Sequence, residues 1–505
     1  MQTRRSPDQR YPRGTPASPG QGRPNILWIT TDQQRHDTVG ALGYAHAHTP
    51  CLDRLVREGA AFTHAYCQSP ICTPSRASFM TGMYPSRVRQ RRNRAAHFPA
   101  PYAREPTLVT HRLAAAGYEC ALVGKLDLAG HPRGIAENDY GYGFVRYCSR
   151  PDRQAEDGSS YHAWLREHGH DPSALLGRAA DRKHGITPFL PPAPTADNVP
   201  VELHHSTWCA ESAIEFIRRP HAGPWLMNLN IFDPHPPYDP PWEYYRRFDA
   251  DALPDPPFRP TDLATRPGLT GVEFQTVARH PDEDGIRSLR AAYLAMIELA
   301  DAQIGRVLDA LDRSGQRDDT VVVLTSDHGD MQGDHGLVRK GCRFYEGLVR
   351  VPLIWRWPGR VQAGLRSDAL VELTDIVPTL LDAVGLAPGR LVTGRTLLPL
   401  LTGGEQGSPH RDFVRAEFHD AQGLGGDGRR MSVATMFRDA RWKLVVYHSH
   451  GVGELYDLED DPEELVNLWD TSSLAATKAR LLEESFASTV LGGDPGPPLM
   501  EDPWS

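Results

Sequence analysis

The sequence has no long hydrophobic run and few cysteines. No apolar stretch approaches the ~18 uninterrupted residues that a membrane span needs, so we expect no membrane-spanning segment. Only 7 of the 505 residues are cysteine, an odd number with no Cys-x-x-Cys pair, which excludes a dense disulfide scaffold. This usage favours a reducing compartment, and we predict a cytoplasmic protein.

An excess of positive charge is also missing. The formal net charge is -9, so nucleic-acid binding has no general electrostatic support, and any anion site must be positive locally. Residues 1–24 are rich in Pro, Gly, Ser and Arg and lack the apolar core of a secretory signal. We therefore predict a disordered N-terminal arm over 1–24.

Short apolar runs alternate with helical patterns from Pro24 onward. Strands are predicted at 25–31, 121–123, 225–231 and 320–325. Helices are predicted from Pro50, with Thr49 as N-cap, at 107–116, at 205–219, and along the apolar stripe from Leu289 to Leu311. This alternation predicts an α/β fold with a large, mainly parallel sheet and helices on both faces.

The pattern changes after Leu386. Strands at 413–418, 433–437 and 442–447, followed by a helix at 474–486, predict a small α+β unit. We place a catalytic domain at 25–408 and this C-terminal subdomain at 409–505. The acidic turn at 459–464 is predicted to be a solvated loop. The polar, Pro-rich segments 150–200 and 239–285 are interpreted as insertions that carry substrate selection.

Polar residues of useful chemistry follow four of the predicted strands. They are Asp32, Lys125, Asp233 with His235, and Asp327 with His328. Ligands of open parallel sheets bind at the carboxyl ends of the strands, so we expect these side chains to meet at one edge.

Cys72 is predicted to begin a helix, with Pro74 in the first turn and Arg76 nearby. The helix N-terminus and the guanidinium both favour an anion at this position. An isolated cysteine is more often buried or incidental, and a low-pKa thiolate nucleophile is a further alternative. The residues alone leave these interpretations open.

The run Cys72-Thr-Pro-Ser-Arg76, followed by Ala77-Ser-Phe-Met-Thr-Gly82, resembles the signature of the formylglycine-dependent sulfatases of the alkaline-phosphatase-like superfamily. Further blocks follow in the family's order: 25–32, 234–238, 325–329, 333–336, Lys340, 345–346, 351–354, 455–458 and 461–464. The resemblance implies an alkaline-phosphatase-like sandwich with a small α+β C-terminal domain. It also implies a hydrolase of organic sulfate esters, whose nucleophile is a formylglycine made from Cys72 after translation.

The resemblance also implies a divalent metal bound by Asp32, Gln33, Asp327 and His328. Oxygen-rich ligands suit Ca²⁺, which we favour, or Mg²⁺, and the His328 nitrogen makes Mn²⁺ a further option. Gln33 stands where a second Asp is usual, and His328 where Asn is frequent. This variant resembles subsets that include choline-sulfatase-like enzymes and phosphonate monoester hydrolases.

By family position, Lys125 and Lys340 contact sulfate oxygens, Arg76 holds the formylglycine and His235 lies near the leaving group. Asn93 is expected to line the pocket, as in the phosphonate-hydrolase subset. One departure concerns Asp127, because the chain reads Gly124-Lys-Leu-Asp127 where the family usually has Gly-Lys-x-His. We interpret Asp127 as a proton acceptor for the hydrated formylglycine that also repels an anionic substrate, and expect it to shift the pH profile.

Two other functions stay open at this point. The first is a phosphonate monoester or phosphodiester hydrolase on the same scaffold, which product analysis with matched aryl esters would distinguish. The second is a non-catalytic binding protein, which an intact Cys72 beside an empty metal site would support. The implied partners are a sugar, choline or aryl sulfate ester and a formylglycine-generating maturation enzyme; the sequence does not determine the oligomeric state.

Overall fold

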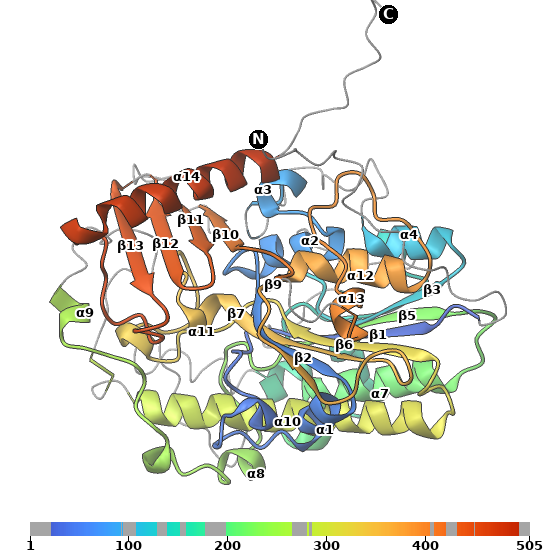
Figure 1. Ribbon diagram of the computed structural model, residues 1–505. Coiled ribbons are helices and arrows are strands. Elements are labelled where there is room, and N and C mark those ends of the chain that lie inside the picture. Colours follow the sequence, from blue (N-terminus) through green and yellow to red (C-terminus); the bar gives the residue numbers. More distant parts are fainter. Residues whose placement is uncertain are drawn as a thin grey trace, which may run out of the picture.

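The computed structural model of this chain describes residues 22–91, 93, 108–128, 139–151, 158–176, 198–264, 280–281, 285–404, 409–420, 432–448 and 450–493. It contains one large and one small sheet (Figure 1). The predicted N-terminal arm lies outside the described residues except for 22–24. Among the described residues, no helix combines the length and the apolar character that a membrane crossing needs.

Nine described strands form the large sheet. In order across it they are β4 (Phe144–Tyr147), β3 (Glu119–Gly124), β5 (Trp225–Ile231), β1 (Asn25–Thr31), β6 (Thr320–Ser326), β7 (Arg350–Arg356), β2 (Ala60–Tyr66) and β8 (Leu365–Ser367), with β9 (Val371–Glu372) paired to β2. The strands from β4 to β6 run parallel, whereas β7 is antiparallel to both of its neighbours. The predicted mainly parallel sheet is therefore confirmed.

Helices cover both faces of this sheet. One layer holds α1 (Pro50–Glu58), α7 (His205–Arg218) and α10 (Ile286–Arg313); the other holds α2 (Cys72–Thr81), α4 (Val109–Ala115) and α12 (Ile376–Ala383) (Figure 1). Strand β1 shows why both layers are needed. Ile26 and Trp28 pack in one apolar cluster with Phe79 of α2, while Leu27 and Ile29 pack in the other, with α1 and α10. A central strand that is apolar on both faces requires cover on both.

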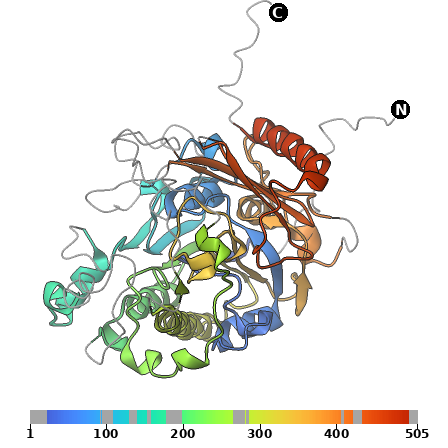
Figure 2. The same ribbon diagram turned by 90° about the vertical axis from the view of Figure 1, so that its left-hand side faces the viewer.

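The C-terminal strands form a separate antiparallel sheet. It runs in chain order through β10 (Val414–His419), β11 (Val433–Arg438), β12 (Trp442–Tyr447) and β13 (Val452–Asp457), and is followed by α14 (Ala475–Gly492). Leu444 and Leu455 pack against Leu481 of α14, whereas Met436 and Val445 join the main core. Figures 1 and 2 place α14 and α10 on opposite sides of the molecule. The α+β C-terminal unit is confirmed, and its boundary at 408/409 stays a prediction.

Some sequence-based details differ from the structure. Helix α4 begins at Val109 rather than at Thr107, which lies outside the described residues, and β13 was not expected. Thr49 precedes α1, but its Oγ1 contacts Asp53 and Gly40 instead of capping the helix. Glu464, expected in a solvated loop, is only 2% exposed because it pairs with a buried lysine.

Besides several single-turn 3-10 helices, six further short α-helices are described. They are α3 (Pro85–Val88), α5 (Ser160–Glu167), α8 (Trp242–Tyr245), α9 (Thr261–Ala264), α11 (Glu346–Val349) and α13 (Leu398–Leu401). Helix α5 belongs to the first expected insertion, and α8 and α9 belong to the second. Much of both insertions lies outside the described residues, and their role in substrate selection stays a prediction.

Candidate active site

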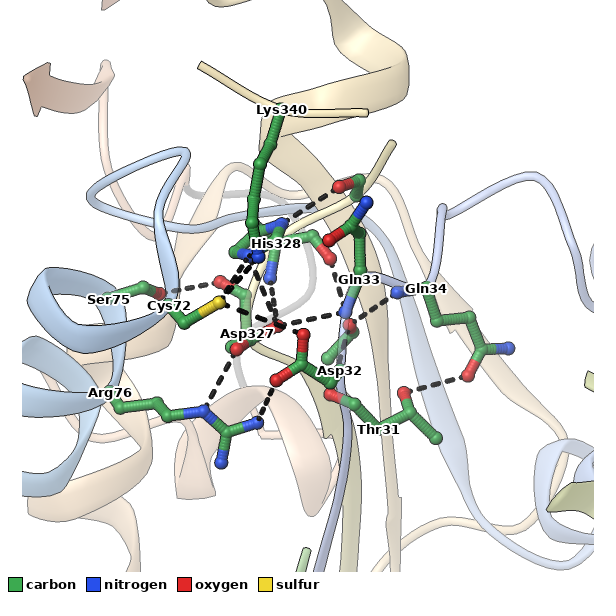
Figure 3. Close-up of polar contacts among 12 residues, drawn as sticks. Thr31, Asp32, Gln33, Gln34, Cys72, Ser75, Arg76, Asp327, His328 and Lys340 are labelled. Carbon is green, nitrogen blue, oxygen red and sulfur yellow. Dashed lines mark hydrogen bonds and ion pairs between the residues drawn. The ribbon is translucent and has the colours of Figure 1, made fainter. Parts of the chain in front are cut away.

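The carboxyl ends of the parallel strands bring most of the predicted polar residues together. Asp32 follows β1, Lys125 follows β3, and Asp327 with His328 follows β6. The strand pairing continues past the strand ends, since Asp32 N donates to Asp233 O after β5 (3.3 Å). The side chains of Asp32, Asp327 and His328 meet at one edge of the sheet, as predicted (Figure 3), and Lys125 contacts Asp32 there. Asp233 does not join them, because its carboxylate accepts from Ser206 Oγ and faces His204 instead.

Cys72 is the first residue of α2, and its thiol points into this cluster (Figure 3). Its Sγ lies 2.6 Å from Lys340 Nζ, 3.2 Å from His328 Nε2 and 3.8 Å from Asp32 Oδ1. All four residues are buried. The side chain therefore lies at the positive end of a helix, where strand ends supply both a carboxylate and an imidazole.

The surroundings of Cys72 disfavour a thiolate. Burial and the neighbouring Asp32 carboxylate raise the pKa of the Cys72 thiol to about 11. An unmodified Cys72 is then protonated at neutral pH and is a weak nucleophile. This argues against the low-pKa thiolate considered from the sequence.

Two buried cations neutralise the two carboxylates of the site. Arg76 Nε donates to Asp327 Oδ2 (2.9 Å) and its Nη2 to Asp32 Oδ2 (3.1 Å), while Lys125 Nζ lies 2.6 Å from the same Asp32 oxygen. Burial alone would raise the pKa of Asp32, but Lys125 and the other nearby positive groups hold this pKa well below its usual value. The carboxylate stays ionised, with Oδ2 toward the cations and Oδ1 toward Cys72.

The donor atoms around Cys72 have the spacing of a metal site. Ligand atoms of Asp32, Cys72, Asp327 and His328 all lie within 4.8 Å of one another. His328 Nδ1 is 2.8 Å from Gly329 O and donates to it, so Nε2 carries the lone pair that faces the cluster. One divalent ion with ligand distances of ~2.0–2.6 Å fits this spacing.

Gln33 adds an oxygen to this set. Its backbone has φ 71°, in the left-handed region, and its carbonyl accepts from Tyr293 Oη (2.7 Å). The side-chain Nε2 donates to Asp330, whereas Oε1 is buried with no hydrogen-bond partner in the part of the chain that is described. An unpartnered buried amide oxygen beside two carboxylates and an imidazole fits Ca²⁺, Mg²⁺ or Mn²⁺.

Asp127 lies at the rim of the cluster. Its Oδ2 is 3.4 Å from Lys125 Nζ, its side chain is 25% exposed, and its φ of 54° is again left-handed. Burial opposes ionisation, but Lys125 and Arg76 lower the pKa of Asp127 below its usual value. A negative charge therefore faces the site where the family usually has an imidazole.

Two further predicted site residues, His235 and Asn93, each contact the backbone near the cluster. His235 is half-buried, and its Nδ1 is 2.6 Å from Pro236 O, to which it donates. Burial and the cation of Lys340 lower the pKa of His235 well below its usual value. Asn93 Oδ1 accepts from Thr73 N (3.1 Å), so Asn93 satisfies a free amide in the first turn of α2.

The sequence did not single out several residues that support this arrangement. Ser75 Oγ donates to Asp327 O (2.6 Å), and Ser326 Oγ donates to His328 O (2.9 Å). Asp330 accepts from Gln33. Ser75 and Ser326 lie inside recognised motifs, but no local pattern shows where a hydroxyl bonds. The roles assigned to the predicted site residues remain predictions.

Two family models match this chain. The model described as Sulfatase matches residues 24–386, and the one described as N-sulphoglucosamine sulphohydrolase, C-terminal, matches residues 333–489. The first match includes the Cys72 motif and every residue of the cluster described above.

Individual relatives resemble the chain over nearly its whole length. An arylsulfatase of Clostridium perfringens is 30% identical over 88% of this chain and 90% of that protein. The multifunctional alkaline phosphatase superfamily protein PehA of Trinickia caryophylli is 29% identical over 90% and 93%. Among solved structures, a phosphonate monoester hydrolase of Agrobacterium radiobacter has a TM-score of 0.77 and 29% identity, with 93% and 96% of the chains covered.

Proposed function

Because this chain belongs to the sulfatase family of sulfuric ester hydrolases, we propose that it cleaves an organic sulfate ester with a formylglycine made from Cys72. One observation carries this proposal. Cys72 Sγ lies at the start of α2 within 4 Å of a carboxylate, an imidazole and an ammonium group. A formylglycine at this position would supply, as its hydrate, a hydroxyl for attack on sulfur and a second hydroxyl whose deprotonation releases sulfate.

Asp32, Gln33, Asp327 and His328 would hold a divalent metal, with Ca²⁺ favoured and Mn²⁺ or Mg²⁺ as options. When bound, the metal lowers the pKa of the attacking hydroxyl and neutralises charge on the ester oxygens. Arg76 bridges the two carboxylates, Asp32 and Asp327, through a hydrogen bond to each. We assign it the task of keeping both carboxylates oriented toward the ion.

Lys125 and Lys340 are proposed to bind the sulfate oxygens. Both are buried beside Cys72 or Asp32, so their charges act in a space that largely excludes water. Asn93 orders the first turn of α2 and is placed at the pocket lining. These groups fix the substrate's sulfur against the residue at position 72.

Two groups are proposed to move protons. His235, with Nδ1 turned to Pro236 O, would protonate the leaving oxygen from Nε2. Asp127, which is ionised beside Lys125, would accept a proton from the hydrated formylglycine. His235 must be protonated to act as the acid, whereas Asp127 must be ionised to act as the base.

The proposal is tested by the mass of the tryptic peptide 58–76, from protein made together with a formylglycine-generating enzyme. Conversion of Cys72 replaces sulfur and two hydrogens with one oxygen and lowers the mass accordingly. The same peptide contains Cys67, a buried cysteine that serves as an internal control. After thiol alkylation, the converted peptide should carry one alkyl group and the unconverted peptide two.

Alkylation of both cysteines is the outcome that would contradict the proposal. If both cysteines are alkylated while a known sulfatase is converted in the same cells, the formylglycine mechanism is wrong for this chain. A Cys72→Ser variant, which keeps Cys67 and a hydroxyl at the site, provides the matched control.

A phosphonate monoester or phosphodiester hydrolase is the second candidate function. The full-length likeness to a phosphonate monoester hydrolase favours it, as do Gln33 and His328 in the ligand set. Matched aryl sulfate, phosphate diester and phosphonate esters separate the two candidates. We expect the largest kcat/KM with the sulfate ester.

The substrate is proposed to be a small or carbohydrate sulfate ester selected by the 150–200 and 239–285 segments. The maturation enzyme is the one protein partner that this chemistry requires. All seven cysteines are unpaired thiols, which supports our proposal of a reducing compartment, the cytoplasm.

A further inference from the structure

Asp330 lies next to Gln33 and is fully buried. Its Oδ2 accepts hydrogen bonds from Gln33 Nε2 and from Tyr238 Oη (2.6 Å). Its Oδ1 accepts from the backbone amides of Gln332 (2.9 Å) and Arg339 (3.0 Å). These four donors match the roughly four lone-pair sites that a carboxylate offers.

This arrangement determines which way the Gln33 amide faces. Because both oxygens of Asp330 act as acceptors, Gln33 must turn its NH₂ group toward Asp330. Its Oε1 then points to the other side, where it is buried without a partner among the described residues. A glutamine amide could otherwise present either end to a cation, whereas a carboxylate ligand has two equivalent oxygens.

Asp330 Oδ1 contacts the segment that carries Lys340. Arg339, whose backbone amide donates to Asp330, directly precedes Lys340, and Lys340 Nζ lies 2.6 Å from Cys72 Sγ (Figure 3). Arg339 and Gln332 both have left-handed backbones, with φ 63° and 48°. Such conformations are strained for residues other than glycine and persist where neighbouring contacts hold them.

We propose that Asp330 is a positioning residue that serves two parts of the site at once. It orients the Gln33 amide so that Oε1 faces the metal, and it fixes the backbone from which Lys340 extends. The inference rests on the proposed metal site and adds to it a residue that no motif assigned.

The test is Asp330→Asn, measured by Mn²⁺ binding to chelator-treated protein, with free Mn²⁺ followed by electron paramagnetic resonance. The Asn oxygen can still accept from the two backbone amides, but its NH₂ group now faces Gln33. The Gln33 amide must then turn over and present NH₂ to the ion. We expect Mn²⁺ affinity to fall about 10–100-fold, as for other residues that orient metal ligands.

An exchanged pair provides the rescue. Gln33→Glu combined with Asp330→Asn keeps the net charge and restores the hydrogen bond with donor and acceptor reversed. This double variant should bind Mn²⁺ about tenfold or more tightly than Asp330→Asn alone. Asp334→Asn is the matched control, since Asp334 is a buried carboxylate on the same loop that pairs with Arg35 instead (2.6 Å). It should keep the native affinity.

The outcomes separate the inference from the function on which it rests. Native affinity in Asp330→Asn, or an exchanged pair that binds no more tightly than the single variant, overturns the positioning role. If the native protein binds neither Mn²⁺ nor Ca²⁺, the metal site itself is wrong, and this inference fails with it. Thermal unfolding of each metal-free variant identifies any that misfolds. If Asp330→Asn misfolds, the Mn²⁺ affinity of the exchanged pair is compared with that of Gln33→Glu alone. Equal affinities in that comparison overturn the positioning role.

Discussion

Nearby positive charges lower the pKa of both Asp127 and His235, but the consequence for the protonation state that each needs is opposite. Lys125 and Arg76, working against burial, lower the pKa of Asp127, so its carboxylate is ionised. Burial and Lys340 lower the pKa of His235, so its imidazole is neutral in the resting site. For a carboxyl group a lowered pKa extends the range of the basic form, whereas for an imidazole it shrinks the range of the acid form.

The first prediction concerns Asp127. A base whose pKa lies below that of an ordinary aspartate is available throughout the mildly acidic range. Asp127→His restores the usual family residue, which accepts a proton only when neutral, above a pKa near ~6.5. We expect kcat/KM of Asp127→His on 4-nitrophenyl sulfate, whose leaving group needs no acid, to fall as pH drops through that value, while the native rate on this ester holds.

Profiles of kcat/KM against pH check this directly. Asp127→Asn, which is close in shape and cannot act as a base, should be slower at every pH. If Asp127→Asn matches the native enzyme in both rate and profile, Asp127 has no part in proton transfer.

The second prediction concerns His235. General acids typically contribute about 10²–10⁴-fold, and their contribution vanishes when the leaving group needs no proton. His235→Ala should therefore lose most of its activity on an alkyl sulfate and little on 4-nitrophenyl sulfate. Because the acid form of His235 grows as pH falls, native kcat/KM for the alkyl ester should rise toward acidic pH.

Rates on a series of esters with increasing leaving-group pKa provide the measurement. Equal losses on alkyl and nitrophenyl esters would place His235 in binding rather than in proton donation.

At the scale of elements, the contact between β3 and β5 positions Lys125. Gly124 ends β3 with φ +89°, and a Cβ at this residue would lie 1.9 Å from Asn230 O. The next residue, Lys125, donates its backbone N–H to the same oxygen (3.1 Å). The absence of a side chain at Gly124 therefore allows the two strands to pair up to the edge of the site.

We predict that Gly124→Ala destabilises the protein by at least about 1–3 kcal/mol, because the methyl group must displace backbone rather than a flexible side chain. Activity should fall as well, since Lys125 moves with the strand end. Denaturant unfolding and kcat together test this. Gly223→Ala is the control, because its nearest neighbour would be Gly117 O at 3.6 Å, an ordinary contact.

Gly223→Ala should change the free energy of unfolding by no more than about 0.5 kcal/mol. A Gly124→Ala variant as stable as this control would mean that the β3–β5 contact tolerates the added methyl group.

At the scale of the whole molecule, a buried lysine joins the C-terminal sheet to the segment that leads into β7. Lys443 of β12 has its Nζ 2.7 Å from Glu346 Oε1 and 2.6 Å from Glu464 Oε1, and donates to Phe344 O (2.9 Å). Glu346 and Phe344 belong to the segment that follows Lys340. Burial opposes ionisation of Glu346, but Lys443 and neighbouring arginines hold its pKa well below the usual value.

We predict that Lys443→Met costs about 3–5 kcal/mol at neutral pH, because it removes the buried cation that Glu346 and Glu464 share. The depressed pKa of Glu346 means that its native contribution is present above the unfolded pKa and is lost as pH falls through the folded one. In the variant, protonation relieves the buried charge. The difference between native and variant should therefore shrink toward acidic pH.

Free energies of unfolding near neutrality and near the ordinary glutamate pKa measure this difference. Adding Glu464→Gln to Lys443→Met should recover part of the loss at neutral pH. A cost that does not depend on pH would mean that lost packing, rather than lost charge, explains the effect.

Much of the catalytic fold could be predicted because its signals are local. The runs 25–31 and 225–231 match β1 and β5 at both ends, since each is rich in large apolar residues and begins directly after a proline, Pro24 or Pro224. The gathering of Asp32, Lys125 and Asp327 followed from a general property of parallel sheets, whose carboxyl ends share one edge. The two-residue interruption by Gly453 and Glu454 hid β13, which becomes evident only through its pairing with β12.

The sequence by itself therefore determined the family, the order of the central elements and which residues meet at the strand ends, because these depend on local patterns and motifs. Only the tertiary structure decided what Asp330, Ser75 and Glu464 do. Ser75 bonds a carbonyl 252 positions away, and Glu464 reaches a backbone amide 118 positions away. No local pattern predicts such contacts, because a polar side chain is equally compatible with solvent until folding places a partner beside it.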